Sequence, residues 1–312
     1  MKTLVTGGVG FIGTNLVKRL LKDGHEVTSI DNYSTGFKEN EQEGCKYYNL
    51  DLANETYIYN LPEEYDVIYH MAALARIQPS IDKPHPAIKN NFLSTLNILE
   101  YARTRNIRVV YAGSSSIHHG IYESPYAWSK FSGEDLCKLY GNVYNMESSI
   151  CRFYNVYGDY QIKEGTYATV LGIFQNQYEN EEPLTIVGDG EQTRDFVHVK
   201  DLVQAVFKAA ISTKTGKIYN VGGAKEIKVN KIAKLIGGKK IHIPKRPGEP
   251  DRSLANIGYI KKDLKWSPKI KIGDGVKDLL KNIKYWKNAP VWTPAKISKA
   301  TKIWFKLLKK RN

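Results

Sequence analysis

The stretch SSSIHHGIYESPYAWSK, residues 114–130, gathers several side chains that can carry out acid–base chemistry. It begins with three consecutive serines and contains two histidines, two tyrosines and one lysine. Tyr126 and Lys130 are four residues apart just after Pro125, so on a helix that begins there both side chains project from one face. Tyrosine is a poor base at neutral pH because its ordinary pKa is about 10. A neighbouring ammonium group lowers this pKa, and the pair could then take a proton from a hydroxyl group. Such a pair also occurs by chance on helix surfaces, so the elements that position it decide its role.

Strand-like and helix-like segments alternate along the chain. Short strands are predicted at 2–6, 25–31, 66–72, 107–113, 147–156, 194–199 and 216–223. Helices are predicted at 11–24, 86–105 and 125–142, and from Asp201 onward. This alternation predicts an α/β fold, a doubly wound parallel sheet with helices on both faces.

Three glycines, Gly7, Gly10 and Gly13, lie between the first strand and the first helix. In this context the first allows a tight turn, the second lets the backbone approach a pyrophosphate, and the third lets the helix pack closely on the sheet. The N-terminus of the helix then faces the phosphates. Asp31 closes the second strand, 18 residues after Gly13, where its carboxylate would bind the adenosine ribose hydroxyls. Because this carboxylate would repel a 2′-phosphate, the sequence predicts NAD rather than NADP as the cofactor.

The composition is that of a globular protein long enough for two lobes. The chain has 312 residues, of which 42% are hydrophobic and 25% charged. It has no apolar run of the ~18 residues that a transmembrane helix needs. Three cysteines, Cys45, Cys137 and Cys151, show no metal-ligand spacing, and we predict no metal site. Few cysteines and no signal-peptide core at the N-terminus predict a cytoplasmic location.

The net charge of +14 is concentrated near the C-terminus, where residues 261–312 carry 16 Lys and Arg against 3 Asp and Glu. A solvated lysine-rich face is expected in preference to nucleic-acid binding. The last segment, 294–312, predicts a basic amphipathic helix. Its apolar side carries Ile297, Ala300, Ile303, Trp304, Leu307 and Leu308. Such a helix can lie on an anionic membrane, but we expect it to pack on its own protein.

The motifs of the chain, taken in order, resemble the extended short-chain dehydrogenase/reductase family in its nucleotide-sugar epimerase/dehydratase branch. They are TGGVGFIG (6–13), DNYSTG (31–36), LDL (50–52), HMAA (70–73), SSS (114–116), YAWSK (126–130), RFYNVYG (152–158), GDGEQTRDFVHV (188–199) and RPGE (246–249). The resemblance implies a Rossmann domain at 1–155, to which 195–224 returns. It also implies a smaller substrate-binding lobe at 156–194 and 225–290. The tail, 291–312, lies outside the resemblance.

The resemblance also implies the residues that bind the cofactor. Besides the three glycines, Asp31, Tyr126 and Lys130, they are Phe11, Ile12, Asn32, Ser34, Gly36, Asp51, Leu52, Ala72, Ala73 and Asn91. Asp51 and Leu52 would border the adenine, and Asn91 would support the site from a neighbouring helix.

At the substrate end, the resemblance assigns the diphosphate of a UDP-sugar to Arg194 and Arg246. Further substrate contacts are implied for Ser115, Ser116, Asn155, Leu184, Glu249 and Ser253. Ser253 falls seven residues after Arg246, where relatives border the C2 substituent of the sugar. Because serine is small, we predict that N-acetylhexosamines are accepted.

The third catalytic residue is predicted to be Ser115, which lies five residues before Gly120, as the hydrogen-bonding Ser or Thr does in the family. Dehydratases and decarboxylases of the family carry acidic residues just after this position, where this chain has Ser116 and Ile117. The resemblance therefore implies an NAD-dependent UDP-sugar 4-epimerase, acting as a homodimer. The loop from Ser115 to Tyr126 is shorter than in relatives, and His118 and His119 on it could touch substrate.

Other readings stay open. The same scaffold supports 4,6-dehydratases, decarboxylases and sugar reductases, although the last use NADPH, which Asp31 disfavours. A protein that only binds NAD is a further alternative, but such relatives tend to lose the tyrosine–lysine pair that is intact here.

Overall fold

The computed structural model describes residues 1–54, 61, 64–163, 169–245, 249–287, 289, 291 and 293–308. Its main element is a seven-stranded parallel sheet in the order β10-β6-β5-β4-β1-β2-β3. The strands are β1 (Lys2–Thr6), β2 (Glu26–Asp31), β3 (Cys45–Asn49), β4 (Val67–His70), β5 (Arg108–Ser114), β6 (Ser148–Phe153) and β10 (Lys217–Val221). The predicted doubly wound sheet is therefore confirmed. Its strand order reverses between β1 and β4, which leaves a crevice at their carboxyl ends.

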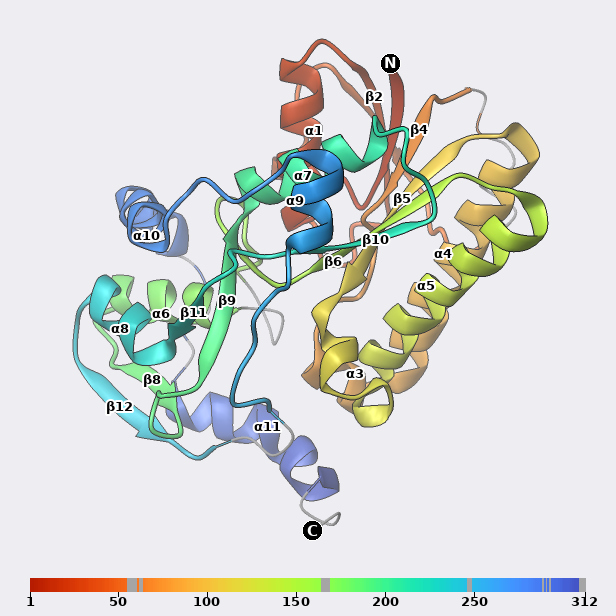
Figure 1. Ribbon diagram of the computed structural model, residues 1–312. Coiled ribbons are helices and arrows are strands. Elements are labelled where there is room, and N and C mark those ends of the chain that lie inside the picture. Colours follow the sequence, from red (N-terminus) through yellow and green to blue (C-terminus); the bar gives the residue numbers. More distant parts are fainter. Residues whose placement is uncertain are drawn as a thin grey trace.

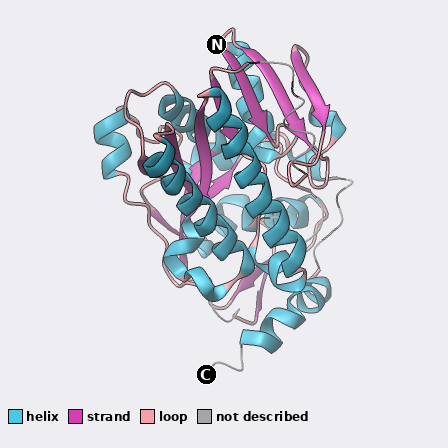
Figure 2. Cartoon of the chain, turned by 90° about the vertical axis from the view of Figure 1, so that its right-hand side faces the viewer, coloured by secondary structure: helices cyan, strands magenta, loops and turns pink. Residues whose placement is uncertain are grey.

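Helices cover both faces of this sheet. Successive side chains on a strand point to opposite faces, and in these strands the side chains on both faces are largely apolar. Leu4 belongs to the core shared with α4 (Pro84–Arg105) and α5 (Pro125–Tyr144). Its neighbour Val5 belongs to the core shared with α1 (Phe11–Lys22) and α7 (Val199–Ala210). Figure 1 shows α4 and α5 on one side of the sheet and α1 and α7 on the other. In Figure 2 the two long helices α4 and α5 lie in front of the strands.

Two smaller sheets lie outside the central one, in the orders β11-β9-β7 and β12-β8. Their strands are β7 (Asn155–Tyr157), β8 (Leu184–Val187), β9 (Thr193–His198), β11 (Glu226–Lys228) and β12 (Lys240–Ile243). The helices α6 (Val170–Glu179), α8 (Val229–Ile236) and α10 (Ile272–Lys281) pack with these strands around a core that contains Phe174, Ile232 and Val276. A further helix, α9 (Gly258–Leu264), contacts α7 and β10.

Two of the differences between predicted boundaries and the structure have a clear cause. The expected strand at 147–156 is two strands, β6 and β7, which belong to different sheets. The break falls at Tyr154, whose amide donates to the carbonyl of Val221 in β10 (3.1 Å). The helix expected from Asp201 begins at Val199, because the side chain of His198 accepts from the amide of Lys200 (3.2 Å) and caps the first turn. The division of the chain into lobes stays a prediction.

The last helix, α11 (Pro294–Leu308), packs on the protein as expected. Its residues Ile297 and Trp304 are buried, whereas Ile303 and Leu307, predicted for the same apolar side, are about half exposed. Among the described residues, no helix is long and apolar enough to cross a membrane.

Candidate active site

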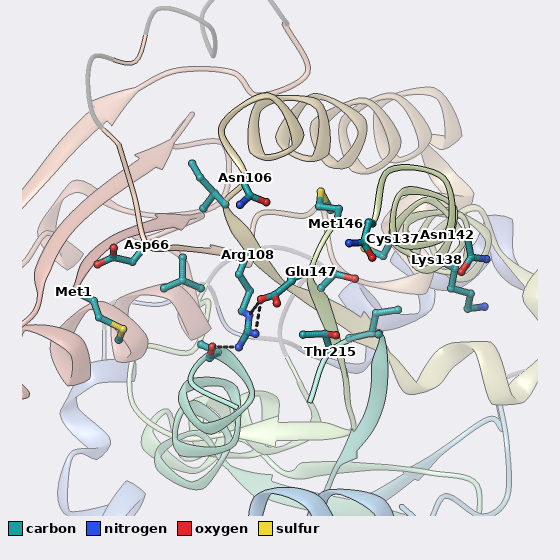
Figure 3. Close-up of a pocket in the computed structure, with 18 residues that line it drawn as sticks. Met1, Asp66, Asn106, Arg108, Cys137, Lys138, Asn142, Met146, Glu147 and Thr215 are labelled. Carbon is teal, nitrogen blue, oxygen red and sulfur yellow. Dashed lines mark hydrogen bonds and ion pairs between the residues drawn. The ribbon is translucent and has the colours of Figure 1, made fainter. Parts of the chain in front are cut away.

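Two hollows open at opposite ends of the central sheet. In the first of them, the arginine Arg108 is used for contacts within the protein. The first, of about 980 Å³, lies where β4, β5, β6 and β10 begin. Figure 3 shows Arg108 in this hollow pointing toward Glu147. The Arg108 guanidinium also donates to the carbonyl of Ala210 at the end of α7 (2.7 Å), so this cation completes a helix terminus. The second hollow, of about 440 Å³, lies at the carboxyl ends of the strands, where open α/β sheets bind ligands.

The glycine-rich turn after β1 forms one wall of this second cavity. Gly7 has φ +73°, and a Cβ atom there would lie 2.9 Å from the backbone of Ala72. A Cβ atom on Gly13 would lie 1.9 Å from the carbonyl oxygen of Gly7. Gly10 precedes the first residue of α1, and Phe11 and Ile12 line the cavity behind it. Bare backbone thus meets the positive end of a helix, which fits the pyrophosphate of a dinucleotide.

Asp31, at the end of β2, ties the adjoining loops to this turn. Its carboxylate accepts from the amides of Val9 (3.2 Å) and Tyr33 (2.9 Å). Burial raises the pKa of Asp31, while these amides oppose the rise. Gly36 packs so closely on the turn that a Cβ atom would lie 2.7 Å from the carbonyl oxygen of Val9. The predicted neighbours Asn32 and Ser34 are exposed, and Thr35, which sequence reasoning missed, lines the cavity.

The adjoining wall follows β4, the strand next to β1. Ala73 lines the cavity, and the amide of Ala72 donates to the Thr6 hydroxyl (3.1 Å). Asn91 is buried on α4, where it accepts from the amide of Leu74 (2.8 Å) and donates to the Ser129 hydroxyl (3.0 Å). It therefore braces this wall from the neighbouring helix.

Two residues predicted near the adenine do not reach the cavity as the structure describes it. Asp51 is exposed and accepts from the amide of Ala53 (2.9 Å). Leu52 is buried, and its carbonyl accepts from the side chain of Asn97 (2.9 Å).

The predicted acid–base pair lies on the first turns of α5, and both side chains line the cavity. Burial lowers the pKa of Lys130 to about 8, and the nearby Glu134 carboxylate opposes this change. The Lys130 ammonium donates to the carbonyl of Ala112 (2.8 Å). The amide of Tyr126 donates to the Ser80 hydroxyl of α3 (Ile77–Asp82; 3.1 Å), which fixes the start of α5 against α3.

Three influences act on the phenol of Tyr126. Burial raises its pKa, whereas a hydrogen bond with Ser114 and the charge of Arg76 lower it. Ser114 also accepts from the amide (3.2 Å) and hydroxyl (2.9 Å) of Ser116. Ser115, predicted for the catalytic role, lines the same cavity beside them. The contact of Ser114 with the tyrosine was missed because motif spacing fixes a backbone position but not the direction of a side chain in a short turn.

Arg76 is a second residue that sequence reasoning missed, since no motif marks it. It lines the cavity directly before α3, and its backbone has φ 119° and ψ 139°, a region that favours glycine. Burial lowers the pKa of its guanidinium.

The two loop histidines lie on different sides of the turn. His119 lines the cavity, whereas His118 stacks on Tyr154 with 6.3 Å between ring centroids. Burial lowers the pKa of both, so both are neutral near pH 7.

At the substrate end, Arg194, Glu249 and Ser253 line the cavity together with Asn155. The Arg194 guanidinium donates to the carbonyl of Pro250 (2.8 Å) and lies 3.7 Å from the Glu249 carboxylate. Asn155 donates to the carbonyl of Asp195 (3.2 Å). Arg246, the other predicted diphosphate ligand, lies outside the described residues.

Leu184 does not face the cavity. It is buried in the core that contains Phe174 and Ile232, whereas Thr185 and Val187 line the cavity. Side chains on a strand alternate between its faces, so Leu184 and its neighbour Thr185 project from opposite faces of β8. Within the described part of the chain, no group of three or more His, Cys, Asp or Glu residues could hold a metal ion.

Comparison with known proteins matches these features to one group. Residues 3–222 match the model of the NAD dependent epimerase/dehydratase family. A putative UDP-glucose 4-epimerase of Methanocaldococcus jannaschii is 34% identical over 88% of this chain and 95% of that protein. UDP-glucuronic acid decarboxylase 1 of Xenopus tropicalis is 30% identical over 92% of this chain and 72% of that protein. The crystal structure of UDP-glucose 4-epimerase with UDP-glucose from Thermotoga maritima superposes with a TM-score of 0.86, at 27% identity, over 92% of this chain and 99% of that one.

Proposed function

The chain belongs to the NAD-dependent epimerase/dehydratase family, and from this premise we propose that it is a UDP-sugar 4-epimerase. Its substrates would be UDP-glucose and UDP-galactose, their N-acetyl forms, or both. The proposal depends on the family's cofactor, NAD, for which the glycine turn and the N-terminus of α1 form a fitting cradle.

The observation that carries the proposal is the shortage of acidic groups around the reacting sugar. Among the described residues that line the cavity, Glu249 is the one carboxylate, and it is paired with Arg194 at the nucleotide end. Ser116 and Ile117 stand where dehydratases and decarboxylases of the family carry acids. Expelling water from C6 of an oxidised sugar needs such an acid, whereas returning hydride to the opposite face of C4 does not. The site therefore supports epimerisation best.

Bound NAD would supply the hydride chemistry of this mechanism, and the chain itself would position the sugar and move the proton. The phenolate oxygen of Tyr126 takes the proton of the C4 hydroxyl and later gives it back. The hydrogen bond from Ser114 and the charge of Arg76 favour the phenolate against the effect of burial. Arg194 holds the diphosphate, so the keto sugar can turn about its link to the nucleotide and present its other face.

The decisive experiment uses the purified protein without added cofactor. It would be incubated separately with UDP-glucose, UDP-galactose and their N-acetyl counterparts, and the nucleotide sugars would then be resolved. Appearance of the C4 epimer in any pair supports the proposal, and Tyr126→Phe should lower kcat by roughly 10²- to 10⁴-fold. If NAD is bound but no epimer forms from any of the four, the proposal is wrong.

Ser253 underlies the proposed acceptance of N-acetyl sugars. It is buried, lines the cavity and has a small side chain. A Ser253→Tyr variant should keep turnover of UDP-glucose and lose turnover of UDP-N-acetylglucosamine. Wild-type protein that turns over UDP-galactose but not UDP-N-acetylgalactosamine would contradict this assignment.

One observation favours a second candidate, a reaction on a UDP-hexuronic acid. The Arg76 cation lines the cavity and acts on Tyr126, where it could pair with a sugar carboxylate. UDP-glucuronic acid therefore belongs in the same assay. Release of carbon dioxide from it, with no epimer from the neutral sugars, would identify a decarboxylase.

We also propose a homodimer formed through the exposed face of α5. The α5 helix leaves Leu139 and Val143 more than half exposed, next to the half-exposed Tyr144. An apolar cluster on one helix face is typical of a buried interface. Light scattering should give twice the chain mass, and a Leu139→Glu, Val143→Glu double variant should give a single chain mass.

A further inference from the structure

The α11 helix turns one side toward the cavity that holds the predicted catalytic residues. Ile297, Thr301 and Trp304 lie on one helical face and are each at most 7% exposed. The same three residues, with Ala300, line the cavity that contains Tyr126 and Lys130. The motif resemblance and the matched family model both end before this helix.

Contacts hold α11 to α3 and hold the chain just before it to α6. Its Ala300 carbonyl accepts from the side chain of Gln78 in α3 (2.6 Å). The chain just before α11 is held to α6, since Trp286 donates to Gln175 (2.9 Å) and the Ala289 carbonyl accepts from Asn176 (3.3 Å). The helix therefore bridges the cavity, and in Figure 1 it runs along the bottom of the molecule below β8.

The contact between α3 and α11 places α11 near Tyr126. Gln78 contacts α11, and Ser80, two residues farther along α3, accepts from the amide of Tyr126 (3.1 Å). The nucleotide end is marked by Arg194, which is held by the carbonyl of Pro250. We infer that α11 lies beside the sugar.

The face that α11 presents makes few directional contacts. Ile297, Ala300 and the ring of Trp304 are apolar, and the Thr301 hydroxyl donates to the carbonyl of Ile297 within the helix (2.9 Å). A wall of this kind confines a sugar without fixing its orientation, because most of the surface that it presents is apolar. Such a wall would let the keto sugar rotate within the pocket and present its other face without leaving the site.

We propose that α11 is the retaining wall of the sugar pocket, with Trp304 holding the oxidised sugar in the site until the hydride returns. This inference rests on the proposed 4-epimerase function. The sugar would be oxidised first, with the hydride of its C4–H bond passing to NAD and the hydroxyl proton passing to Tyr126. An opened wall would act at this point. The keto sugar can then leave as free product, and the reduced cofactor stays behind on the enzyme.

The test compares Trp304→Ala with Leu307→Ala in the full-length protein. Leu307 is an apolar residue of the same helix that is 52% exposed, so its loss should change nothing. With the reacting UDP-sugar, Trp304→Ala should raise KM and accumulate reduced cofactor, seen by its near-ultraviolet absorbance, by roughly tenfold over wild type. Free 4-keto nucleotide sugar should appear in equal amount, and Trp304→Phe should restore most of the retention.

Inhibition by UDP alone provides the control for folding, because its contacts lie at the other end of the cavity. It should stay within about twofold of wild type in all three variants. Wild-type epimerisation with no rise in KM or in reduced cofactor for Trp304→Ala would overturn the inference alone. Absence of epimerisation by the wild type would overturn the proposed function and this inference with it.

Discussion

Replacing Glu134 by glutamine should affect both stability and catalysis, because this residue connects a buried ion pair to Lys130, the lysine proposed for catalysis. The Glu134 side chain is 0% exposed and pairs with Arg152, whose side chain is 17% exposed. The guanidinium makes three contacts with the two carboxylate oxygens, at 2.7, 3.0 and 3.1 Å. Removing one charge of a buried pair costs ~3–5 kcal/mol, because the other charge is left without compensation. Glutamine keeps one acceptor oxygen, so we expect a loss of about 3 kcal/mol, or roughly 5 °C in Tm for a chain of 312 residues.

The catalytic effect follows from Lys130, whose pKa the Glu134 carboxylate raises against the effect of burial. Without that carboxylate the pKa of Lys130 falls below about 8, so the ammonium is lost at lower pH. The basic limb of kcat/KM against pH should therefore move to lower pH in Glu134→Gln.

The matched control is Asp135→Asn, the next residue of α5. Asp135 pairs with Lys138 at the surface, where their side chains are 48% and 46% exposed. Its loss should cost under about 1 kcal/mol and leave the pH profile unchanged. Equal losses of Tm in Glu134→Gln and Asp135→Asn, or an unmoved basic limb, would refute the reasoning.

Other variants probe the cofactor turn, the buried histidine and the serines. Gly13→Ala should abolish retention of NAD through purification, since the new Cβ atom would lie 1.9 Å from a carbonyl oxygen, whereas Gly273→Ala meets nothing within 4 Å and should retain it. Burial lowers the pKa of His70 to about 3. As the pH falls below the ordinary histidine pKa of about 6.5, the unfolded chain binds a proton at His70 and the folded protein does not, so the folded state loses stability. From pH 6.5 to 5, chemical denaturation should show the wild type losing roughly 2 kcal/mol more than His70→Asn. If Ser114 bonds the catalytic tyrosine, Ser114→Ala should move the acid limb of kcat/KM to higher pH, and Ser115→Ala should lower kcat without moving it.

The parts of the fold that could be predicted are those in which a functional motif lies beside a clear strand or helix pattern. Glycines at 7, 10 and 13, placed between an apolar run and a helical period, specify β1, the turn and α1 together. β3 gave no such signal, because it lies at the edge of the sheet and none of its five residues is buried. α6 also escaped prediction, since its polar Gln175, Asn176 and Gln177 are buried by tertiary contacts that no local pattern reveals.

The site was predictable to the level of backbone positions and not beyond. The motifs predicted that Tyr126, Lys130, Arg194 and Ser253 belong to one site, and all four line the same cavity. Which side chain turns toward the tyrosine depends on the short turn after β5, which the spacing of residues does not encode. Arg76 and the α11 wall depend on contacts between distant segments, which become visible only once the chain is folded.

The position of β10 beside β6 sets the order in which the protein can form during synthesis. The edge of β6 has no strand partner until β10 is made, and about 60 residues lie between them, which at the usual rate takes roughly 3–12 s. During that interval a nascent chain presents an unpaired strand edge, whose backbone N–H and C=O groups pair readily with other chains. Conditions that slow elongation within residues 154–216 should therefore lower the soluble yield more than an equal delay after residue 222.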